Sequence, residues 1–191
     1  MWTTKTDKMF AKRMKKVLPH IIHHNQTGFV KGRNITDGIR TMLDIVVDTD
    51  VNKISGILMT IDFEKAFDSL DWQYLFEALK SFNFGPTFIH WIQILYRDIT
   101  SCIINKIVTS NYSPLCGGVR QGDPLSPLLF VLAVEILAIN IRSNHDIHGL
   151  FFTKKEIKVL SYADDTSAVL ATIDDVKILI KADRATFYVT R

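Results

Sequence analysis

The stretch IKVLSYADDTSAVLA, residues 157–171, consists of two apolar segments that meet at an acidic pair. β-Branched and other apolar residues dominate both halves, which predicts two strands, 157–162 and 166–171. Asp164 and Asp165 stand between them at the expected turn. Adjacent carboxylates repel each other unless something positive lies beside them. The pair therefore indicates either a bound cation or a plain Asp-Asp turn whose side chains are solvated.

A third carboxylate changes the balance between these alternatives. The segment ISGILMTID, residues 54–62, is apolar almost throughout, which predicts a strand covered on both faces. It ends on Asp62, where an apolar residue would cost less if the position were only part of the core. Three carboxylates without a neighbouring His or Cys favour a hard ion, Mg²⁺ or Mn²⁺. Phosphoryl transfer with two metal ions requires such a set.

The remaining elements follow from periodicity and from breakers. Helices are predicted over 5–22, with Pro19 near the end, and over 36–47, with Asn34 or Thr36 as the cap. Further helices are predicted over 71–82, 87–97, 124–142 and 174–187, with short strands in 101–115. Residues 148–152 and 157–162 predict a hairpin around Lys154-Lys155. This order predicts an α+β fold, an antiparallel sheet with helices packed on one face.

Composition excludes several classes of protein. The 191 residues are 47% hydrophobic and 23% charged, which excludes disordered and collagen-like chains. Two cysteines make no disulfide framework and suit a reducing compartment. The first residues have no apolar core of a secretory signal, so we expect an intracellular protein that is not secreted. Residues 125–141 fall short of the ~20 apolar residues of a bilayer span, so we expect a buried helix and no membrane partner.

Positive charge is concentrated at the front of the chain. Residues 1–40 hold nine Lys or Arg and two acids, whereas the whole chain has a net charge of only +3. This distribution suits a polyanionic partner, although a solvated helix face has the same pattern. His20, His23 and His24 have a spacing that could mimic a metal site. No Cys or acid stands near them in the sequence, which argues against one.

Four segments resemble reverse transcriptases of non-LTR (LINE-type) retrotransposons. IDFEKAFDSLD (61–71), GGVRQGDPLSPLLF (117–130) and SYADDT (161–166) are similar to three successive motifs of that family, in the family's order. HNQTGFVKGRNITDGIR (24–40) resembles its fingers-to-palm segment, and the whole resemblance covers about residues 8–173. It implies an RNA-directed DNA polymerase, a nucleotidyltransferase that adds dNTPs to a DNA primer on an RNA template. It also implies partial fingers over 1–53 and a palm over 54–191, and a location in a cytoplasmic ribonucleoprotein or the nucleus.

The resemblance also assigns roles to the carboxylates and to substrate-binding residues. Asp62 and Asp164 become the principal ligands of two Mg²⁺ ions, with Mn²⁺ possible, and Asp165 becomes the second hairpin carboxylate. All three would be catalytic. The substrate-binding residues it implies are Phe63, Phe67, Arg120, Gln121, Gly122 and Tyr162.

These substrate-binding residues have distinct implied roles. The backbone from Phe63 would pass beside the triphosphate, and Phe67 would be the steric gate that excludes a ribose 2′-OH, unless its ring is ordinary core. Gln121 and Gly122 would touch the incoming base pair and the template, and Arg120 would contact a phosphate. Tyr162 would lie under the primer end, or it is a half-buried strand aromatic.

Basic residues of the front segment could hold the template by its phosphates, which would make binding salt-sensitive. These are Lys12, Arg13, Lys15, Lys16, Lys31 and Arg33. The chain departs from the family in lacking part of the fingers, the thumb and an endonuclease domain. We therefore expect a fragment of a longer polyprotein. The alternative is a truncated, inactive remnant that only binds nucleic acid.

Overall fold

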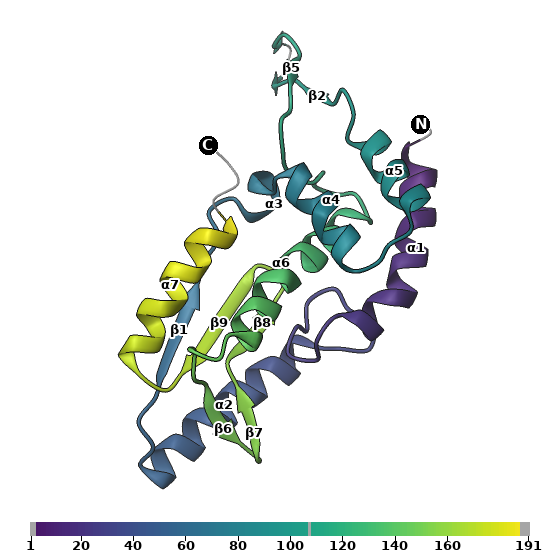
Figure 1. Cartoon of the computed structure of the whole chain (residues 1–191). Helices are drawn as coiled ribbons and strands as arrows, with labels where there is room; N and C mark the ends of the chain where they lie inside the picture. Colours follow the sequence, from purple (N-terminus) through teal and green to yellow (C-terminus); the bar gives the residue numbers. More distant parts are fainter. Residues whose placement is uncertain (1–2, 107, 188–191) are drawn as a thin grey trace.

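The computed structural model describes residues 3–106 and 108–187. Its centre is an antiparallel sheet in the order β1 (Ile57–Ile61), β9 (Asp165–Leu170), β8 (Val159–Tyr162). Strands β8 and β9 are joined by the predicted turn at Asp164-Asp165, and β1 lies on the other side of β9 (Figure 1). Ile61 pairs with Thr166, and Tyr162 pairs with Asp165. The acidic turn and the end of β1 therefore lie at the same end of the sheet.

Helices cover both faces of this sheet, so the prediction that they pack on one face is wrong. Helices α6 (Ser126–Ser143) and α7 (Ile173–Phe187) pack on one face, where Ala168 joins their core. Helix α2 (Ile35–Asn52) packs on the other, where Val169 joins Ile45. Successive strand residues point to opposite faces, and β9 is apolar at both 168 and 169. Each face therefore needs its own helical cover.

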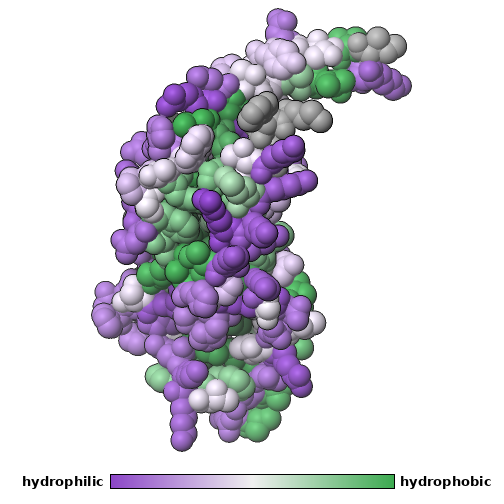
Figure 2. All heavy atoms as spheres, turned by 90° about the vertical axis from the view of Figure 1, so that its right-hand side faces the viewer, coloured by the Kyte–Doolittle hydropathy of each residue, from purple (hydrophilic) through white to green (hydrophobic). Residues whose placement is uncertain are grey.

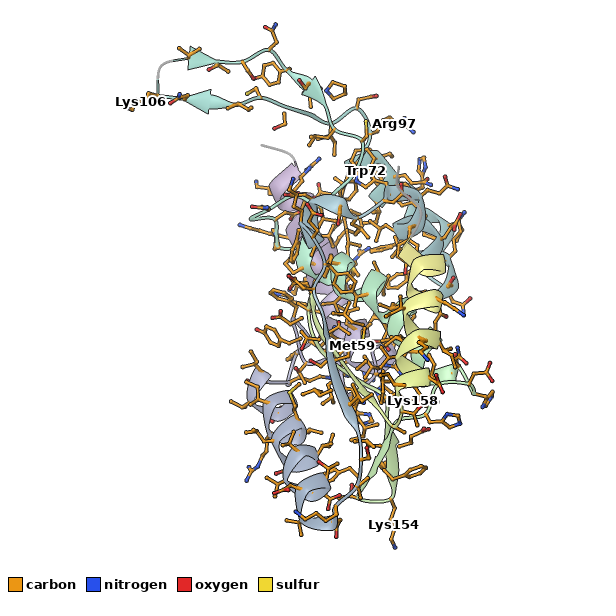
Figure 3. The ribbon with its side chains drawn as sticks, turned by 90° about the vertical axis from the view of Figure 1, so that its left-hand side faces the viewer. Met59, Trp72, Arg97, Lys106, Lys154 and Lys158 are labelled. Carbon is orange, nitrogen blue, oxygen red and sulfur yellow. The ribbon has the colours of Figure 1, made fainter. Side chains whose placement is uncertain are left out.

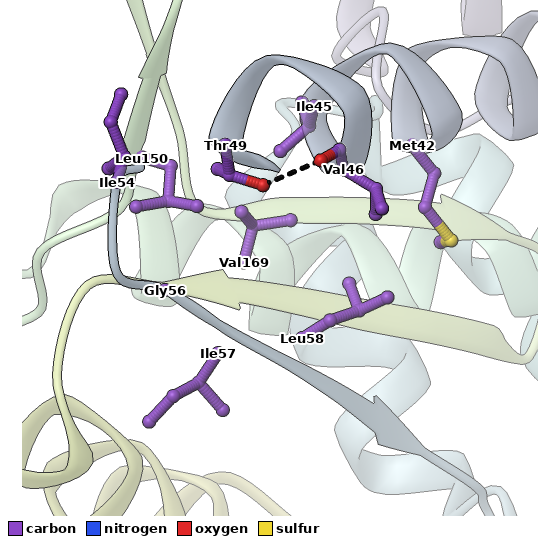
Figure 4. A pocket seen from close by; sticks show the side chains of 10 residues that line it. All are labelled: Met42, Ile45, Val46, Thr49, Ile54, Gly56, Ile57, Leu58, Leu150 and Val169. Carbon is purple, nitrogen blue, oxygen red and sulfur yellow. Dashed lines mark hydrogen bonds between the residues drawn. The ribbon is translucent and has the colours of Figure 1, made fainter. Parts of the chain in front are cut away.

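The cover provided by α2 is incomplete over β1. An apolar hollow of about 130 Å³ remains between α2 and the sheet, and Figure 4 shows Met42, Ile45 and Leu58 around it. Leu58 is 46% exposed, so the prediction that this strand is covered on both faces is wrong on the α2 side. The reason is topological, because β1 is an edge strand and α2 lies mainly over β8.

A second, larger core holds the helical part of the molecule together. Helices α1 (Thr3–Ile21), α4 (Trp72–Ser81) and α5 (Pro86–Leu95) surround the first half of α6, and a one-turn helix, α3 (Ala66–Ser69), precedes α4. The most buried side chains of this core include Met14, Leu75, Ile92 and Leu129. Among the described residues, α6 is the one helix long and apolar enough to cross a membrane, and 67% of it is buried inside the fold. Its apolar character is thus used in the core.

Two hairpins extend from these cores. The first is an arm of four two-residue strands, β2 (Thr100–Ser101) paired with β5 (Ser113–Pro114) and β3 (Ile104–Asn105) paired with β4 (Val108–Thr109). The arm projects from the body in Figures 1 and 3. The second pairs β6 (Leu150–Phe152) with β7 (Lys155–Ile157). The strand predicted over 157–162 is therefore divided between two sheets at Lys158.

Candidate active site and nucleic-acid interface

The three predicted catalytic carboxylates lie at one end of the central sheet, where its strands end or begin. Asp62 directly follows β1, Asp164 lies in the two-residue turn between β8 and β9, and Asp165 begins β9. Because Ile61 pairs with Thr166, the next step along both strands brings Asp62 level with Asp165. Asp62 and Asp165 are exposed and Asp164 is half-buried, so water and solutes can reach all three.

The chemistry of these donors fits Mg²⁺, which prefers oxygen ligands and retains several waters. Within residues 3–106 and 108–187, no three His, Cys, Asp or Glu side chains are grouped closely enough to form a metal site by themselves. The fold thus gathers three suitable carboxylates at one end of the sheet without closing them into a cage. A site in which substrate phosphates supply some of the ligands needs no such cage.

A buried glutamine holds the turn that carries Asp164. Gln26 lies in the loop after α1, and its Oε1 accepts hydrogen bonds from the N–H groups of Ala163 (2.9 Å) and Gly28 (2.8 Å). Its Nε2 donates to the carbonyl of Ala163 at 3.3 Å. Ala163 has a φ of +56°, a conformation that an L residue adopts at a cost. These contacts stabilise that conformation directly beside Asp164.

The same loop also docks on the strand before the turn. The N–H of Thr27 donates to the carbonyl of Ser161 at 2.8 Å, and the N–H of Ser161 donates to Asn25 at 2.9 Å. Sequence reasoning identified this segment as a loop but gave Gln26 and Gly28 no role. Their sequence separation from the acidic turn hides the contact. The one available sign was a polar Gln next to a Thr-Gly pair in a segment that resembles the family.

The predicted steric gate lies where two of the motifs meet. Phe67, in α3, stacks on Phe130 of α6 with ring centroids 4.6 Å apart. Its carbonyl accepts a hydrogen bond from Val119 at 2.7 Å, and Gln121 Nε2 donates to Asp68 at 3.3 Å. A Cβ on Gly118 would lie 2.9 Å from the carbonyl oxygen of Asp68. The loop 117–122 is thus packed closely onto α3.

The other predicted substrate-binding residues occupy varied environments. Gly122 has a φ of +81° and open space around it, so its backbone is accessible. Tyr162 is half-buried with its ring centroid 6.4 Å from that of Phe29, and Phe63 is half-buried between two cores. The guanidinium of Arg120 donates to the carbonyl of Leu95 and lies 5.9 Å from the centre of the Tyr96 ring, with Asp7 at 3.9 Å. Arg120 is therefore anchored to the protein, with its side chain 32% exposed.

Basic side chains of the front segment gather in a groove of about 860 Å³ along α1. Its lining includes the predicted contacts Lys12, Lys15, Lys16 and Lys31, together with Lys8 and His20. Figure 2 looks onto this side of the molecule and shows hydrophilic side chains over much of it. Arg13 is exposed on α1 and does not line the groove.

Arg33 is bound to the backbone instead. Its Nη1 donates to the carbonyls of His23 and Gln26, and its Nη2 donates to those of Pro19 and Ile22. The bonds to Pro19 and Ile22 lie at the end of α1, where the last carbonyls have no partner within the helix. Burial, the largest effect, lowers the pKa of Arg33, while the nearby Glu135 carboxylate raises it. The structure thus places Arg33 as a support of the loop that holds the acidic turn.

Comparisons with known proteins agree with this arrangement. The family model for "Reverse transcriptase (RNA-dependent DNA polymerase)" matches residues 3–187. The chain is 34% identical over 174 residues, 89% of its length, to the Transposon TX1 uncharacterized 149 kDa protein of Xenopus laevis. It is 28% identical over 135 residues, 69% of its length, to the Pol polyprotein of the type-1 retrotransposable element R2 of Nasonia vitripennis.

A solved structure of telomerase from Candida tropicalis, truncated from its C-terminal domain, has a similar fold. It superposes with a TM-score of 0.58 over 94% of this chain and 36% of that one, at 15% identity. The chain spans only 13% of the length of each of the two retrotransposon proteins. The family model nonetheless matches almost the whole of this chain, residues 3–187. The chain therefore belongs to the reverse transcriptase (RNA-dependent DNA polymerase) family, with relatives among the TX1 and R2 non-LTR retrotransposon proteins.

Proposed function

We propose that this chain is the polymerase core of a non-LTR retrotransposon protein and adds dNTPs to a DNA primer on an RNA template. The observation that carries the proposal is that Asp62, Asp164 and Asp165 lie together at one end of the sheet. The three would hold two Mg²⁺ ions, with Mn²⁺ as a substitute. Such ions lower the pKa of an attacking hydroxyl and stabilise the charge that develops on a leaving pyrophosphate.

The residues around the carboxylates position the substrates. Phe67 limits the space beside the sugar of the incoming nucleotide, and its stacking on Phe130 fixes the ring. Gln121 and Gly122 form a surface for the new base pair on a loop that α3 supports. Lys12, Lys16 and Lys31 hold the template through its phosphates. Tyr162 supports the primer end next to the acidic turn, and Phe63 keeps the backbone after Asp62 near the triphosphate.

The architecture of the proposal follows the family. Residues 1–53 act as partial fingers and 54–191 as a palm, and a thumb and an endonuclease belong to other parts of a longer polyprotein. Such a protein works inside the cell, in a ribonucleoprotein or the nucleus. The alternative function is a catalytically inactive remnant that only binds nucleic acid, which the basic groove along α1 would also support.

Primer extension tests the carboxylate site. With poly(A), an oligo(dT) primer, dTTP and Mg²⁺, the wild-type chain should extend the primer. The double variant Asp164→Asn, Asp165→Asn should be at least about 100-fold slower, since removing metal ligands removes several kcal/mol of transition-state stabilisation. Asp174→Asn is the matched control, because Asp174 is an exposed carboxylate in the first turn of α7. It should extend like the wild type.

Two other outcomes would change the conclusion. A folded wild type that binds template in a salt-dependent way but never extends the primer would establish the binding-only alternative. Equal extension by the wild type and the double variant would exclude the acidic pair from the chemistry.

Nucleotide choice tests Phe67. We expect Phe67→Val to raise the use of UTP relative to dTTP by about tenfold or more, because a smaller side chain leaves room for the 2′-OH. Phe84→Val is the control, since Phe84 is a half-buried aromatic that stacks on Phe88. A lower melting temperature with an unchanged nucleotide ratio would show that Phe67 serves only the core.

A further inference from the structure

A second basic depression lies away from the carboxylates. It is a hollow of about 510 Å³ bounded by the loop after α1, by α2, by the end of α6 and by the β6–β7 hairpin. Its charged and titratable lining residues are His23, His24, Arg142, Lys155, Lys158 and Glu156. Arg142, Lys155 and Lys158 are cations, and Glu156 is the one lining carboxylate. The hollow is therefore a region of positive potential.

Two of the cations that line this hollow, Arg142 and Lys158, are held in place by the fold. The carboxylate of Glu135, only 1% exposed, pairs with Arg142 and accepts a hydrogen bond from the His23 N–H at 3.2 Å. Lys158 Nζ donates to the carbonyls of Arg142 (3.3 Å) and Asn144 (2.9 Å). Side chains that are already ordered lose little entropy when they bind a ligand. The hollow is thus organised before any ligand arrives.

The two histidines are suited to an oxyanion. Asn25 N–H points at Nδ1 of His23 at 3.3 Å, so neutral His23 carries its proton on Nε2 and can donate from there. The ring centroids of His23 and His24 lie 4.0 Å apart. Burial first, and then Arg142, His24, Arg33 and Lys155, lower the pKa of His23 to about 4. Burial and then Lys155, Arg33 and Arg142 lower the pKa of His24 as well.

The positive surroundings of these imidazoles would be relieved by a bound anion. The nearby carboxylate of Glu135 is already engaged with Arg142, and Glu156 lies 3.6 Å from Lys158. Lys155 lines the hollow, is exposed, and belongs to none of the ion pairs found among the described residues. A ligand with several negative oxygens could therefore meet Lys155, Arg142 and the His23 Nε2–H together. Phosphate has this chemistry.

We propose that this hollow binds a backbone phosphate of a nucleic-acid strand, at a site distinct from the carboxylates and from the groove along α1. The inference deepens the proposed function and rests on its claim that the chain binds nucleic acid. His20 lines the α1 groove and His23, three residues later, lines the hollow. Lining residues of the two basic depressions thus lie three positions apart at the end of α1, a span that one nucleic-acid strand could bridge.

Two neighbouring lysines provide a matched pair for the test. Lys155 lines the hollow, whereas Lys154, at the tip of the β6–β7 hairpin, does not, and Figure 3 shows Lys154 at the outer end of the molecule. Both are exposed, so charge reversal leaves the core intact. We would measure the fluorescence anisotropy of a labelled single-stranded RNA with the wild type, Lys155→Glu, Lys154→Glu and Lys12→Glu across a range of salt concentrations.

Lys155→Glu should weaken binding several-fold and reduce the salt slope by about one unit, since one phosphate contact is lost. Lys154→Glu should bind like the wild type, and Lys12→Glu should weaken binding through the α1 groove. Equal binding by the Lys154 and Lys155 variants would overturn the site while leaving the proposed function intact. A wild type that binds no RNA even at low salt would overturn both.

Inorganic phosphate separates the two sources of the anion. Added in place of chloride at constant ionic strength, it should displace RNA from the wild type no better than chloride does. Displacement specific to phosphate, lost in Lys155→Glu, would show that free phosphate also occupies the hollow and competes there with the strand. NMR titration of His24 adds a direct readout, because bound RNA should raise the pKa of this imidazole in the wild type and not in Lys155→Glu.

Discussion

Gly28 shows how closely the loop after α1 approaches the acidic turn. A Cβ at this position would lie 2.3 Å from the backbone nitrogen of Ala163, a distance that no side chain can relieve by changing rotamer. A substitution must therefore push the loop away from the turn or move the turn itself. Either movement breaks the contacts of Gln26 with Ala163, which stabilise the positive φ next to Asp164.

We expect Gly28→Ala to lower the free energy of unfolding by about 1–3 kcal/mol, the usual cost of overpacking. Primer extension should fall as well, because the turn carries Asp164. Gly85→Ala is the control, since nothing lies within 4 Å of a Cβ there and φ is −61°. It should change stability by no more than about 0.5 kcal/mol. Chemical denaturation measures both variants, and equal losses would contradict the role of the close approach.

The candidate site was predictable from sequence at the level of single carboxylates. The apolar pattern defined the strand ends at which Asp62, Asp164 and Asp165 stand, and the structure places all three at one end of the sheet. Gln26 was not predictable, because its partner Ala163 is 137 positions away in the sequence. Arg33 was expected at the template, but a guanidinium with four carbonyl partners leaves no mark in the local sequence.

Helices were predicted better than strands at the scale of elements. Asp71, the first residue of the predicted helix 71–82, caps α4 and accepts a hydrogen bond from Tyr74 at 2.7 Å. Helix α2 begins directly after Asn34, one of its two predicted caps. These signals are local and depend on one turn of chain. The division of 157–162 between two sheets depends on pairing with two different strands, through Leu150 before it and Ala168 after it. Periodicity therefore identified the strands but could not assign them to sheets.

The start of α7 gives a prediction that depends on pH. Asp175 is buried and accepts hydrogen bonds from Thr172 and His148. Burial would raise its pKa, but the hydrogen bonds outweigh it and lower the pKa from 3.8 to about 2. The stabilisation is therefore present above pH 3.8 and is lost as the pH falls toward 2.

Asp175→Ala should cost about 1 kcal/mol or more at pH 7, because Thr172, just before α7, loses the capping-box hydrogen bonds that the Asp175 carboxylate accepts from it. The difference in melting temperature from the wild type should shrink as the pH falls from about 4 to about 2. Asp174→Ala, at an exposed neighbouring carboxylate paired with Lys177, should have a small effect throughout. A difference for Asp175→Ala that stays constant with pH would contradict the lowered pKa.

The molecule as a whole consists of a packed body and a projecting arm. The arm exposes large apolar side chains, with Ile103 77% and Ile104, Val108 and Tyr112 each 71% exposed. Among the residues that the structure describes, its short strands pair with one another and with no strand of the body. Since few apolar contacts tie it to the body, its local stability should be far below that of the cores.

Limited trypsin digestion should therefore cut after Lys106, at the end of the arm, well before it cuts at Lys158, which is 8% exposed. Mass spectrometry of the first fragments identifies the site. The nicked protein should keep the melting temperature of the intact chain, because the arm contributes little to the cores. Early cleavage at Lys158 would show that the β8 region opens as readily as the arm.

The contact between Gln26 and Ala163 has a consequence for how the chain reaches its final form. During synthesis, the loop around Gln26 emerges long before Ala163 and cannot find its partner until the β8–β9 hairpin has left the ribosome. Contacts between residues so far apart in the sequence slow folding, because a large loop must close before they form. The acidic turn should thus be among the last regions to order. A nascent chain that ends before this turn lacks Asp164 and Asp165 and therefore has no complete polymerase site.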